Sequence, residues 1–513
     1  MHNYWWINVL LLVPLVGGVA VVASRKVPGA AFVVGVVTAS VELVLAAIVT
    51  GLYSWHNTVV LPCATKGCTP GSISTTLDFA HRWVIARSFG LAYEVGVDGL
   101  SLFLVLLTAI VVLLALLGAR ERRNEPAFVG WLLLLTTATI GSFVSFDLLE
   151  FFLFFELTLI PSYFLIAQWG GKERSRAALK FFVYTLFGSG FLLVGLIYLA
   201  FSYQHAHGGD LTFNYIVLQS ATLSHGTAVW IFVAFAIAFA VKSPIFPFHT
   251  WSPLAYAEAP VAGSMVLSAL LAKLGTYGLL RFGIFLLPEA LHTVQPYLMT
   301  LAVIGILYGS ALAAMSKDMK RLVAYSSLAQ VGFIILGVAS GSKIAITGAV
   351  LLMFNHGVIT AAFFLIIGFI EHRRGTAQIS DLAGLQRPAP VLAALFTVVM
   401  LASIGLPGLS GFVSEYLVLI GTFGTHTWWA TVATLGVVLA ALYLLWAYQR
   451  VFHGQAEGAN AEISDASSRE RWIVAPLIVL IVLLGVYPKP VLDRITPTVN
   501  HHVIVIEQST EPK

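Results

Sequence analysis

The chain has 513 residues, of which 58% are hydrophobic and 10% are charged, whereas an ordinary soluble domain carries about 25% charged residues. With a mean hydropathy of +0.90, this composition excludes a soluble globular fold. The polar stretches reach no more than about 45 residues, too short for a catalytic globular domain of roughly 50 to 250 residues. Any chemistry therefore lies inside a membrane or on a partner, and the net charge of +4 does not indicate a nucleic-acid partner.

The sequence offers no recognisable cofactor site. Its two cysteines, Cys63 and Cys68, are too few for an iron–sulfur cluster, which needs four ligands. No spacing of His and Cys resembles a zinc site, and neither GxGxxG nor a phosphate-binding GxxxxGKS or GxxxxGKT motif occurs. We therefore expect no cofactor and no metal in this chain. The cysteines fall in the longest predicted outer loop, residues 53–95, where a disulfide and two free thiols both remain open.

Apolar runs bounded by polar residues or by Gly and Pro predict fourteen membrane spans of about 20 residues each. In chain order they lie near residues 5–23, 30–52, 96–118, 127–146, 148–168, 177–203, 227–247, 260–284, 296–315, 321–340, 345–370, 391–421, 428–450 and 472–487. Because lipid offers the backbone no hydrogen-bond partners, each span must be a helix. The predicted fold class is an all-α polytopic membrane protein, whose first span is retained because no cleavage site follows it.

Basic residues predict the orientation of these spans. One set of loops holds eighteen of the 28 Lys and Arg residues, and the opposite set, which includes both termini, holds eight. Cytoplasmic loops carry the excess of positive charge, so both termini are expected on the outer side. The two remaining basic residues, Lys242 and Lys273, lie inside apolar spans.

Five titratable side chains are predicted at membrane depth in five different spans: Glu156, Lys242, Lys273, His356 and Glu415. A lysine at the centre of a span costs about 2.5 to 3.5 kcal/mol on insertion scales, so each should face the bundle interior or a wet cavity. Scattered structural ion pairs are the alternative, and for His356 alone a packing role outweighs a relay. Together the five favour a pathway for protons.

Two of these charges lie beside predicted helix breaks. Pro244 and Pro247 follow Lys242, and the segment 407–411 (Pro-Gly-Leu-Ser-Gly) interrupts the span of Glu415. A break at membrane depth persists only where protein or water satisfies the freed backbone groups, although a simple kink is the plainer alternative for one break. Two such breaks, one in each half of the chain, are typical of transporters built from inverted repeats.

Three stretches resemble a known family. These are VKSPIFPFHTWSPLAYAEAPVAGSMVLSALLAKLGTYGLLRF, DMKRLVAYSSLAQVGFIILG and FFELTLIPSYFLIAQWG. They are similar to the antiporter-like membrane subunits of respiratory complex I, over roughly residues 90 to 450. The resemblance implies a fourteen-span, proton-translocating subunit of an NADH:quinone oxidoreductase in a bacterial inner membrane, with no cofactor of its own. It also implies neighbouring membrane-arm subunits as partners within the lipid bilayer, and no nucleic acid.

The resemblance also assigns the relay, residue by residue. Glu156 matches the family's glutamate in the fifth span, and Lys242 matches its lysine in the broken seventh. Lys273 matches the lysine of the eighth span and His356 the histidine of the eleventh. Glu415 matches the acid of the broken twelfth. Two positions depart from the family pattern, because Tyr256 and Gln330 stand where many members have histidine. Gln330 cannot titrate, so we expect it to orient water beside the path.

Three geometric expectations follow from this assignment. Glu156 and Lys242 should form an ion pair across two spans. A path from Lys242 through Lys273 to His356 and on to Glu415 should be bridged by water wherever gaps exceed hydrogen-bond distance. Glu415, four residues after Gly411, should lie in the first turn of the resumed helix and act as the terminal proton acceptor.

The expected organisation has four parts. Residues 1–126 hold the first three spans and the outer loop, 127–290 and 291–452 each form a five-helix antiporter-like repeat, and 453–513 hold the fourteenth span and a tail. The competing hypotheses are a subunit of a multi-subunit Na+/H+ antiporter, which shares the Glu and Lys positions, and a purely structural membrane scaffold. The buried lysines argue against the scaffold because their insertion cost would go unexplained.

Overall fold

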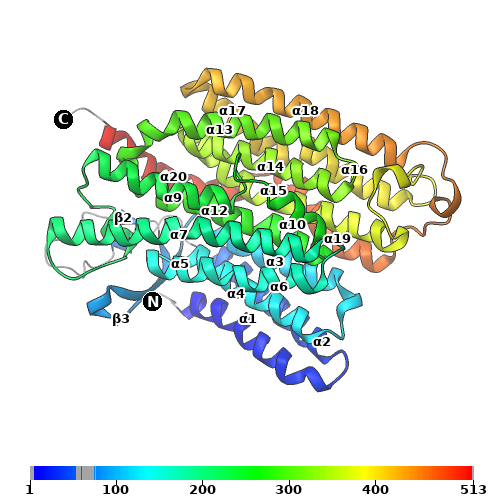
Figure 1. Cartoon of the computed structure of the whole chain (residues 1–513), viewed down its shortest axis with the longest axis horizontal. Coiled ribbons are helices and arrows are strands. Elements are labelled where there is room, and N and C mark those ends of the chain that lie inside the picture. The colour runs from blue at the N-terminus through cyan, green and yellow to red at the C-terminus, as the bar shows by residue number, and fades with distance from the viewer. Residues whose placement is uncertain (1–4, 54–58, 61–73, 76, 511–513) are drawn as a thin grey trace.

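The computed structural model describes residues 5–53, 59–60, 74–75 and 77–510. The described chain is almost entirely helical, and most helices run side by side along the long axis of the molecule (Figure 1). The predicted cysteine loop, with Cys63 and Cys68, lies outside the described residues. Helices α1 (Trp5–Ala23) and α2 (Ala30–Leu52) form one edge of the bundle, and α18 (Thr427–Phe452) forms the opposite edge.

A β-hairpin, which the sequence did not predict, occupies the end of the outer loop. Strands β3 (Asp78–Ala86) and β4 (Leu91–Val97) pair antiparallel, while the short β1 (Val59–Val60) and β2 (Ser74–Thr75) form a second pair. The 3-10 turn Arg87–Phe89 and Gly90 close the hairpin, and Gly90 has a φ of 66°. A Cβ at Gly90 would lie 2.6 Å from the Leu211 carbonyl oxygen, so both conformation and space require glycine there.

Seven helices follow the hairpin in chain order. They are α3 (Leu102–Gly118), α4 (Pro126–Val144), α5 (Leu148–Leu157), α6 (Leu159–Trp169), α7 (Arg174–His207), the short α8 (Tyr215–Leu218) and α9 (His225–Lys242). Asp147 caps α5, because its carboxylate accepts hydrogen bonds from the amides of Leu149 and Glu150. The predicted span 148–168 is interrupted at Thr158, because Pro161 lacks the N–H that would bond the Leu157 carbonyl.

The next span contains two π-helical segments. After α10 (Ser252–Glu258), the chain continues through α11 (Val261–Val266), the π-helix η4 (Leu267–Leu271), α12 (Ala272–Gly278) and the π-helix η5 (Leu279–Ile284). Lys273 lies in the short α-helical stretch between them. Segments of π-helix are rare and occur frequently at functional sites.

The C-terminal half holds eight helices of the described chain. They are α13 (Pro288–Met315), α14 (Met319–Ala339), α15 (Lys343–Arg374), α16 (Pro390–Ile404), α17 (Ser410–Thr425), α18, α19 (Ser468–Val486) and α20 (Lys489–Thr510). Both predicted breaks are present, because α9 ends at Lys242 and the span 391–421 divides into α16 and α17. Between these two helices Gly405 and Gly408 adopt φ values of 83° and 91°, which end α16.

The described helices give fewer candidate spans than the fourteen that the sequence predicted. Eleven described helical segments are long and apolar enough to cross a membrane, and the bent pair α19 and α20 makes a twelfth. The shorter apolar helices α3 and α16 coincide with other predicted spans, so the count of fourteen, the inverted repeats and the four-part division stay predictions. Helix α20 is a further departure, because the sequence predicted a tail there; it is bent by 69° from α19 and packs against α15 and α13.

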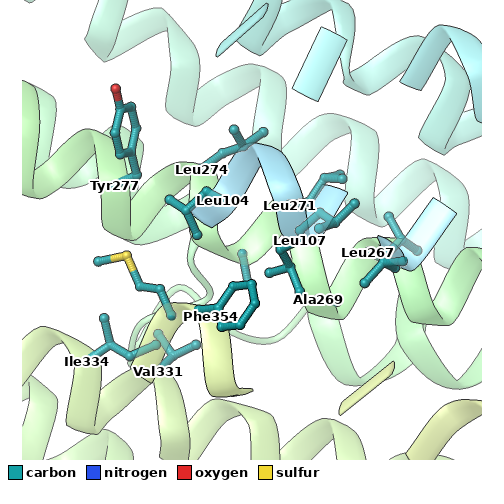
Figure 2. Close-up of a cluster of buried hydrophobic side chains, with 14 of the residues drawn as sticks. Leu104, Leu107, Leu267, Ala269, Leu271, Leu274, Tyr277, Val331, Ile334 and Phe354 are labelled. Atoms are coloured by element: carbon teal, nitrogen blue, oxygen red, sulfur yellow. The ribbon is translucent and has the colours of Figure 1, made fainter. Parts of the chain in front are cut away.

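The centre of the bundle is formed by α15 and the π-helical span. All of the apolar window of α15 and of residues 261–284 is buried, against 33% in α1 and α2. Figure 2 shows Leu104 and Leu107 of α3, Leu271 of η4 and Phe354 of α15 meeting in one apolar cluster. Side chains of Lys273 and His356 therefore emerge from the two most deeply buried segments, and α1 and α2 keep apolar faces for lipid.

Candidate functional site

Lys242 ends α9 and reaches the break between α5 and α6. Its ammonium donates to the Thr158 hydroxyl at 2.8 Å and to the Phe155 carbonyl at 3.5 Å, and lies 4.4 Å from the centre of the Phe155 ring. The lysine is 1% exposed. The end of α5 thus supplies two oxygen acceptors and an aromatic face to a buried cation.

The structure does not place Glu156 and Lys242 in the predicted direct ion pair, although their charges are close enough to interact. Among the described residues, no carboxylate lies within 4.0 Å of the Lys242 ammonium. One carboxylate oxygen of Glu156 is buried without a hydrogen-bond partner. The Lys242 ammonium is held instead by the Thr158 hydroxyl and the Phe155 carbonyl at the end of α5.

Lys273 and His356 are in direct contact. The Lys273 ammonium lies 2.9 Å from His356 Nδ1 and donates to the Ser268 carbonyl at 2.7 Å. Lys273 is 0% and His356 2% exposed. A protonated lysine can only donate, so Nδ1 then accepts and Nε2 of the neutral ring carries its proton. No water is needed to bridge this step of the predicted path, for which the sequence had suggested one.

Glu415 of α17 accepts a hydrogen bond from the Gln330 side-chain amide of α14 at 2.8 Å. Gly405 lines the same carboxylate, since a Cβ there would lie 2.6 Å from Glu415 Oε2. Helix α17 begins at Ser410 and has no acidic residue in its first turn. The predicted first-turn position of Glu415 is therefore wrong, because the helix resumes at Ser410 and places Glu415 in the second turn.

Several polar residues at the site escaped the sequence interpretation. Asn355, next to His356, donates to the Ser410 carbonyl at 2.8 Å and to the Ser414 hydroxyl at 3.3 Å. Thr158 and Asn355 both interrupt apolar runs beside a predicted relay residue, and that adjacency was an available signal. Tyr256, which departs from the family pattern, is 1% exposed and its hydroxyl has no partner in the described structure.

Arg281 is a second unpredicted feature, because the sequence placed it in an outer loop. It is 1% exposed and forms an ion pair of 2.6 Å with Asp98 before α3. Its guanidinium lies 4.8 Å from the ring centre of Phe146, and its Nε donates to the Tyr277 hydroxyl at 3.2 Å. An arginine inside the run GTYGLLRFGIFLL was the signal for burial.

The six predicted relay residues thus fall into three groups. Lys273 touches His356, Gln330 touches Glu415, and Lys242 lies against the end of α5, which carries Glu156. The described hydrogen bonds do not join one group to the next. The arrangement can hold protons at three buried places, each on an interrupted or distorted helix.

This arrangement defines a class of polytopic membrane protein with buried lysines and acids on broken helices. The family profile described as NADH:quinone oxidoreductase/Mrp antiporter, transmembrane, matches residues 145–442. The chain belongs to this family. It is 38% identical to NADH-quinone oxidoreductase subunit M of Mycobacterium tuberculosis strain H37Rv, covering 99% of this chain and 96% of that one. It is 41% identical to the Rhodobacter capsulatus subunit M, covering 82% and 83%.

Solved structures show the same fold. A chain of respiratory complex I from Thermus thermophilus with bound NADH superimposes with a TM-score of 0.86 at 31% identity, covering 98% of this chain and 99% of that one. A chain of the Mrp complex from Dietzia sp. DQ12-45-1b superimposes with a TM-score of 0.81 at 20% identity, covering 99% of each chain. At that identity the second likeness concerns the fold alone.

Proposed function

We propose that this chain is a proton-translocating membrane-arm subunit of a complex I type NADH:quinone oxidoreductase, driven by quinone reduction in other subunits. The observation that carries the proposal is the contact between Lys273 and His356, two titratable groups buried in the centre of the bundle. Such groups inside a membrane protein mark proton and ion pathways. The likeness to subunit M relatives and to complex I favours this assembly over the antiporter.

Each group has a role in this proposal. Lys242 holds a proton against Thr158 and Phe155, and Glu156 modulates that proton through its charge. Lys273 passes a proton from Nζ to His356 Nδ1, while the ring releases the one on Nε2. Glu415 accepts the proton at the far end and Gln330 orients its carboxylate. Direct transfer needs about 2.6 to 3.2 Å or one intervening water, so the gaps between groups must hydrate during turnover.

The proposal also states where the chain lies and which part of the reaction belongs to other subunits. Without the buried Arg281, the two sets of loops hold eighteen and seven basic residues, and this distribution supports a bacterial inner membrane topology with both termini outside. Electron transfer belongs to other subunits, and this chain contributes no cofactor to it. The chain is therefore part of an enzyme through its assembly, and its own work is proton movement.

The test is the Lys273→Gln variant of the intact complex, reconstituted into proteoliposomes. The variant keeps a polar side chain but cannot titrate, so proton uptake coupled to NADH oxidation should fall at least about tenfold. Lys320→Gln is the matched control. Lys320 forms an ion pair of 2.9 Å with Glu371 and takes no part in the relay. Unchanged proton uptake in an assembled Lys273→Gln complex would contradict the proposal. Uptake that requires Na+ would favour the antiporter.

A further inference from the structure

A cavity with one cationic and one apolar end lies at the predicted inner end of α2, away from the relay. Its volume is about 890 Å³, and it is lined by Leu117, Arg120, Arg123, Asn124, Arg469 and seven residues between Val27 and Val34. These residues come from the start of α2, the end of α3 with its following turn, and the start of α19. None of them takes part in the proposed proton path.

The cationic end consists of three arginines. Within the described chain, Arg120, Arg123 and Arg469 form no ion pair, whereas Arg122 is paired with Glu125 at 3.0 Å and Arg373 with Glu470. Arg469 donates to the Leu117 carbonyl, which points its guanidinium toward the end of α3. The same three arginines also line an adjacent cavity of about 770 Å³ that contains four glutamates. The first cavity has no acidic residue among its described lining.

The other end is a hydrocarbon wall formed by the first turn of α2. Val27 and Val33 are 60% and 59% exposed, and Ala30, Phe32 and Val34 continue the apolar lining. Gly29, the N-cap residue directly before α2, has a φ of 75°, which turns the chain so that Val27 and α2 border one opening. A membrane helix has its apolar side chains in lipid, so this wall continues into the acyl region.

We propose that this cavity binds one anionic phospholipid of the inner leaflet, with its phosphate on Arg120, Arg123 and Arg469 and an acyl chain along Val27 to Val34. Charge complementarity carries the assignment, because three unpaired guanidiniums present several donors to phosphate oxygens. Basic pockets between membrane helices on the cytoplasmic side are typical sites for such headgroups. Free phosphate would use the arginines and leave the apolar wall uncovered, so the lipid is the occupant that fits both ends.

A bound lipid would connect parts of the chain that are far apart in sequence. The phosphate would bridge the turn after α3 and the first turn of α19, while the acyl chain would cover the start of α2. Among described contacts, α19 packs against α3 and α15, so the lipid adds to an existing junction. This inference concerns binding, and its test does not depend on proton transport.

The experiment compares bound lipid in the intact purified complex by native mass spectrometry and lipid analysis. The Arg120→Gln/Arg123→Gln/Arg469→Gln variant should lose at least one anionic phospholipid per complex. After delipidation, its half-saturation concentration for phosphatidylglycerol should rise at least threefold, with no change for phosphatidylcholine. The matched control is Arg176→Gln, because Arg176 is an exposed arginine on the same predicted side, paired with Glu173 at 3.4 Å.

A second variant tests the apolar end without changing charge. Val33→Trp places a larger side chain in the apolar end of the cavity and should cause the same loss of lipid. This variant is the test if the triple variant fails to assemble. Retention of the full lipid complement by either assembled variant would overturn the proposal. Displacement of the lipid by millimolar inorganic phosphate alone, or a neighbouring subunit's acidic side chain on the three arginines, would also overturn it.

Discussion

At the scale of single residues, the buried Lys242 ammonium is held by groups at the end of α5. Its ammonium donates to the Thr158 hydroxyl at 2.8 Å and contacts the Phe155 ring. A buried ammonium that loses an acceptor retains its desolvation cost, about 1 to 3 kcal/mol or more for a charged group. The state of this proton therefore depends on one hydroxyl as well as on the charge of Glu156.

We predict that Thr158→Val lowers proton translocation by the reconstituted complex about tenfold, because it removes one acceptor and leaves the shape nearly unchanged. Thr136→Val is the control: Thr136 is equally buried, but its hydroxyl bonds only the Leu132 carbonyl of its own helix, at 2.8 Å. Proton uptake measured with a fluorescent pH-gradient dye distinguishes the two. Equal effects of both substitutions would show a general packing defect.

Glu156→Gln tests the electrostatic part of the same group. Since no hydrogen bond joins Glu156 to Lys242 in the described structure, the carboxylate acts through its charge alone. We predict a clear fall in proton uptake and, where the two are tightly coupled, in NADH oxidation. Assembly, followed by native electrophoresis, should be unchanged. Normal uptake by an assembled Glu156→Gln complex would remove Glu156 from the relay.

Gly405 is a further residue whose identity affects the site, because it borders the Glu415 carboxylate. Its φ of 83° favours glycine, and a Cβ there would lie 2.6 Å from Glu415 Oε2. Gly405→Ala should therefore both strain the turn, at about 1 to 3 kcal/mol, and displace the carboxylate. We predict a loss of proton uptake larger than that of Gly424→Ala, where no atom lies within 4 Å of the added Cβ.

At the scale of elements, the hairpin is bound to the bundle through a buried carboxyl. The Glu94 carboxylate of β4 accepts from the Asn214 side chain and lies 3.5 Å from Arg82 Nε. Burial raises the pKa of Glu94 from its ordinary value to about 7, with Arg82 opposing the rise and Asp147 adding to it. In the folded hairpin this carboxyl holds its proton more tightly than in the unfolded chain.

The sign of the resulting pH dependence is opposite to that of an exposed ion pair. The stabilisation is present at low pH and is lost as the pH rises from about 4.5, the ordinary value, through about 7, by up to about 3 kcal/mol. We predict that protection of the β3 and β4 amides from hydrogen exchange falls over this range. Glu94→Gln should flatten the dependence, and an unchanged profile would place the titration elsewhere.

The elements also show what the sequence could predict. The apolar runs predicted the helices and the prolines predicted the end of α9, because both signals are local. The start of α17 at Ser410 was misplaced, since helix bounds depend on partners such as Asn355 that lie far away in sequence. The one-residue break at Thr158 was missed although its signal, Pro161, is local. The same limit hid the hairpin and α20, whose residues are stabilised by contacts with other helices.

At the scale of the whole molecule, α15 links two of the three groups. His356 contacts Lys273, while the preceding Asn355 donates to the Ser410 carbonyl and the Ser414 hydroxyl, directly before Glu415. A shift of α15 would therefore move both groups together, although no hydrogen bond runs between them. The sequence analysis named Lys273, His356 and Glu415 for one path, which stays a prediction, but it did not name Asn355, whose contacts join α15 to α17.

If α15 couples the two groups, substitution of Glu415 should change proton transport. Its carboxylate is 5% exposed, accepts from Gln330 and lies against Gly405. Glu415→Gln keeps the shape, and the new amide oxygen can still accept from Gln330, but the side chain can no longer titrate. We predict at least about a tenfold fall in proton uptake by the assembled complex.

The control for this variant is Glu371→Gln, since Glu371 is paired with Lys320 at the predicted inner end of α15 and takes no part in the relay. Quantitative native electrophoresis separates a transport defect from a folding defect, because a stabilising role for Glu415 would lower the amount of complex and leave uptake per complex unchanged. Full proton uptake at normal assembly would contradict the role of terminal acceptor. The proton path along α15 would then end at the contact between Lys273 and His356.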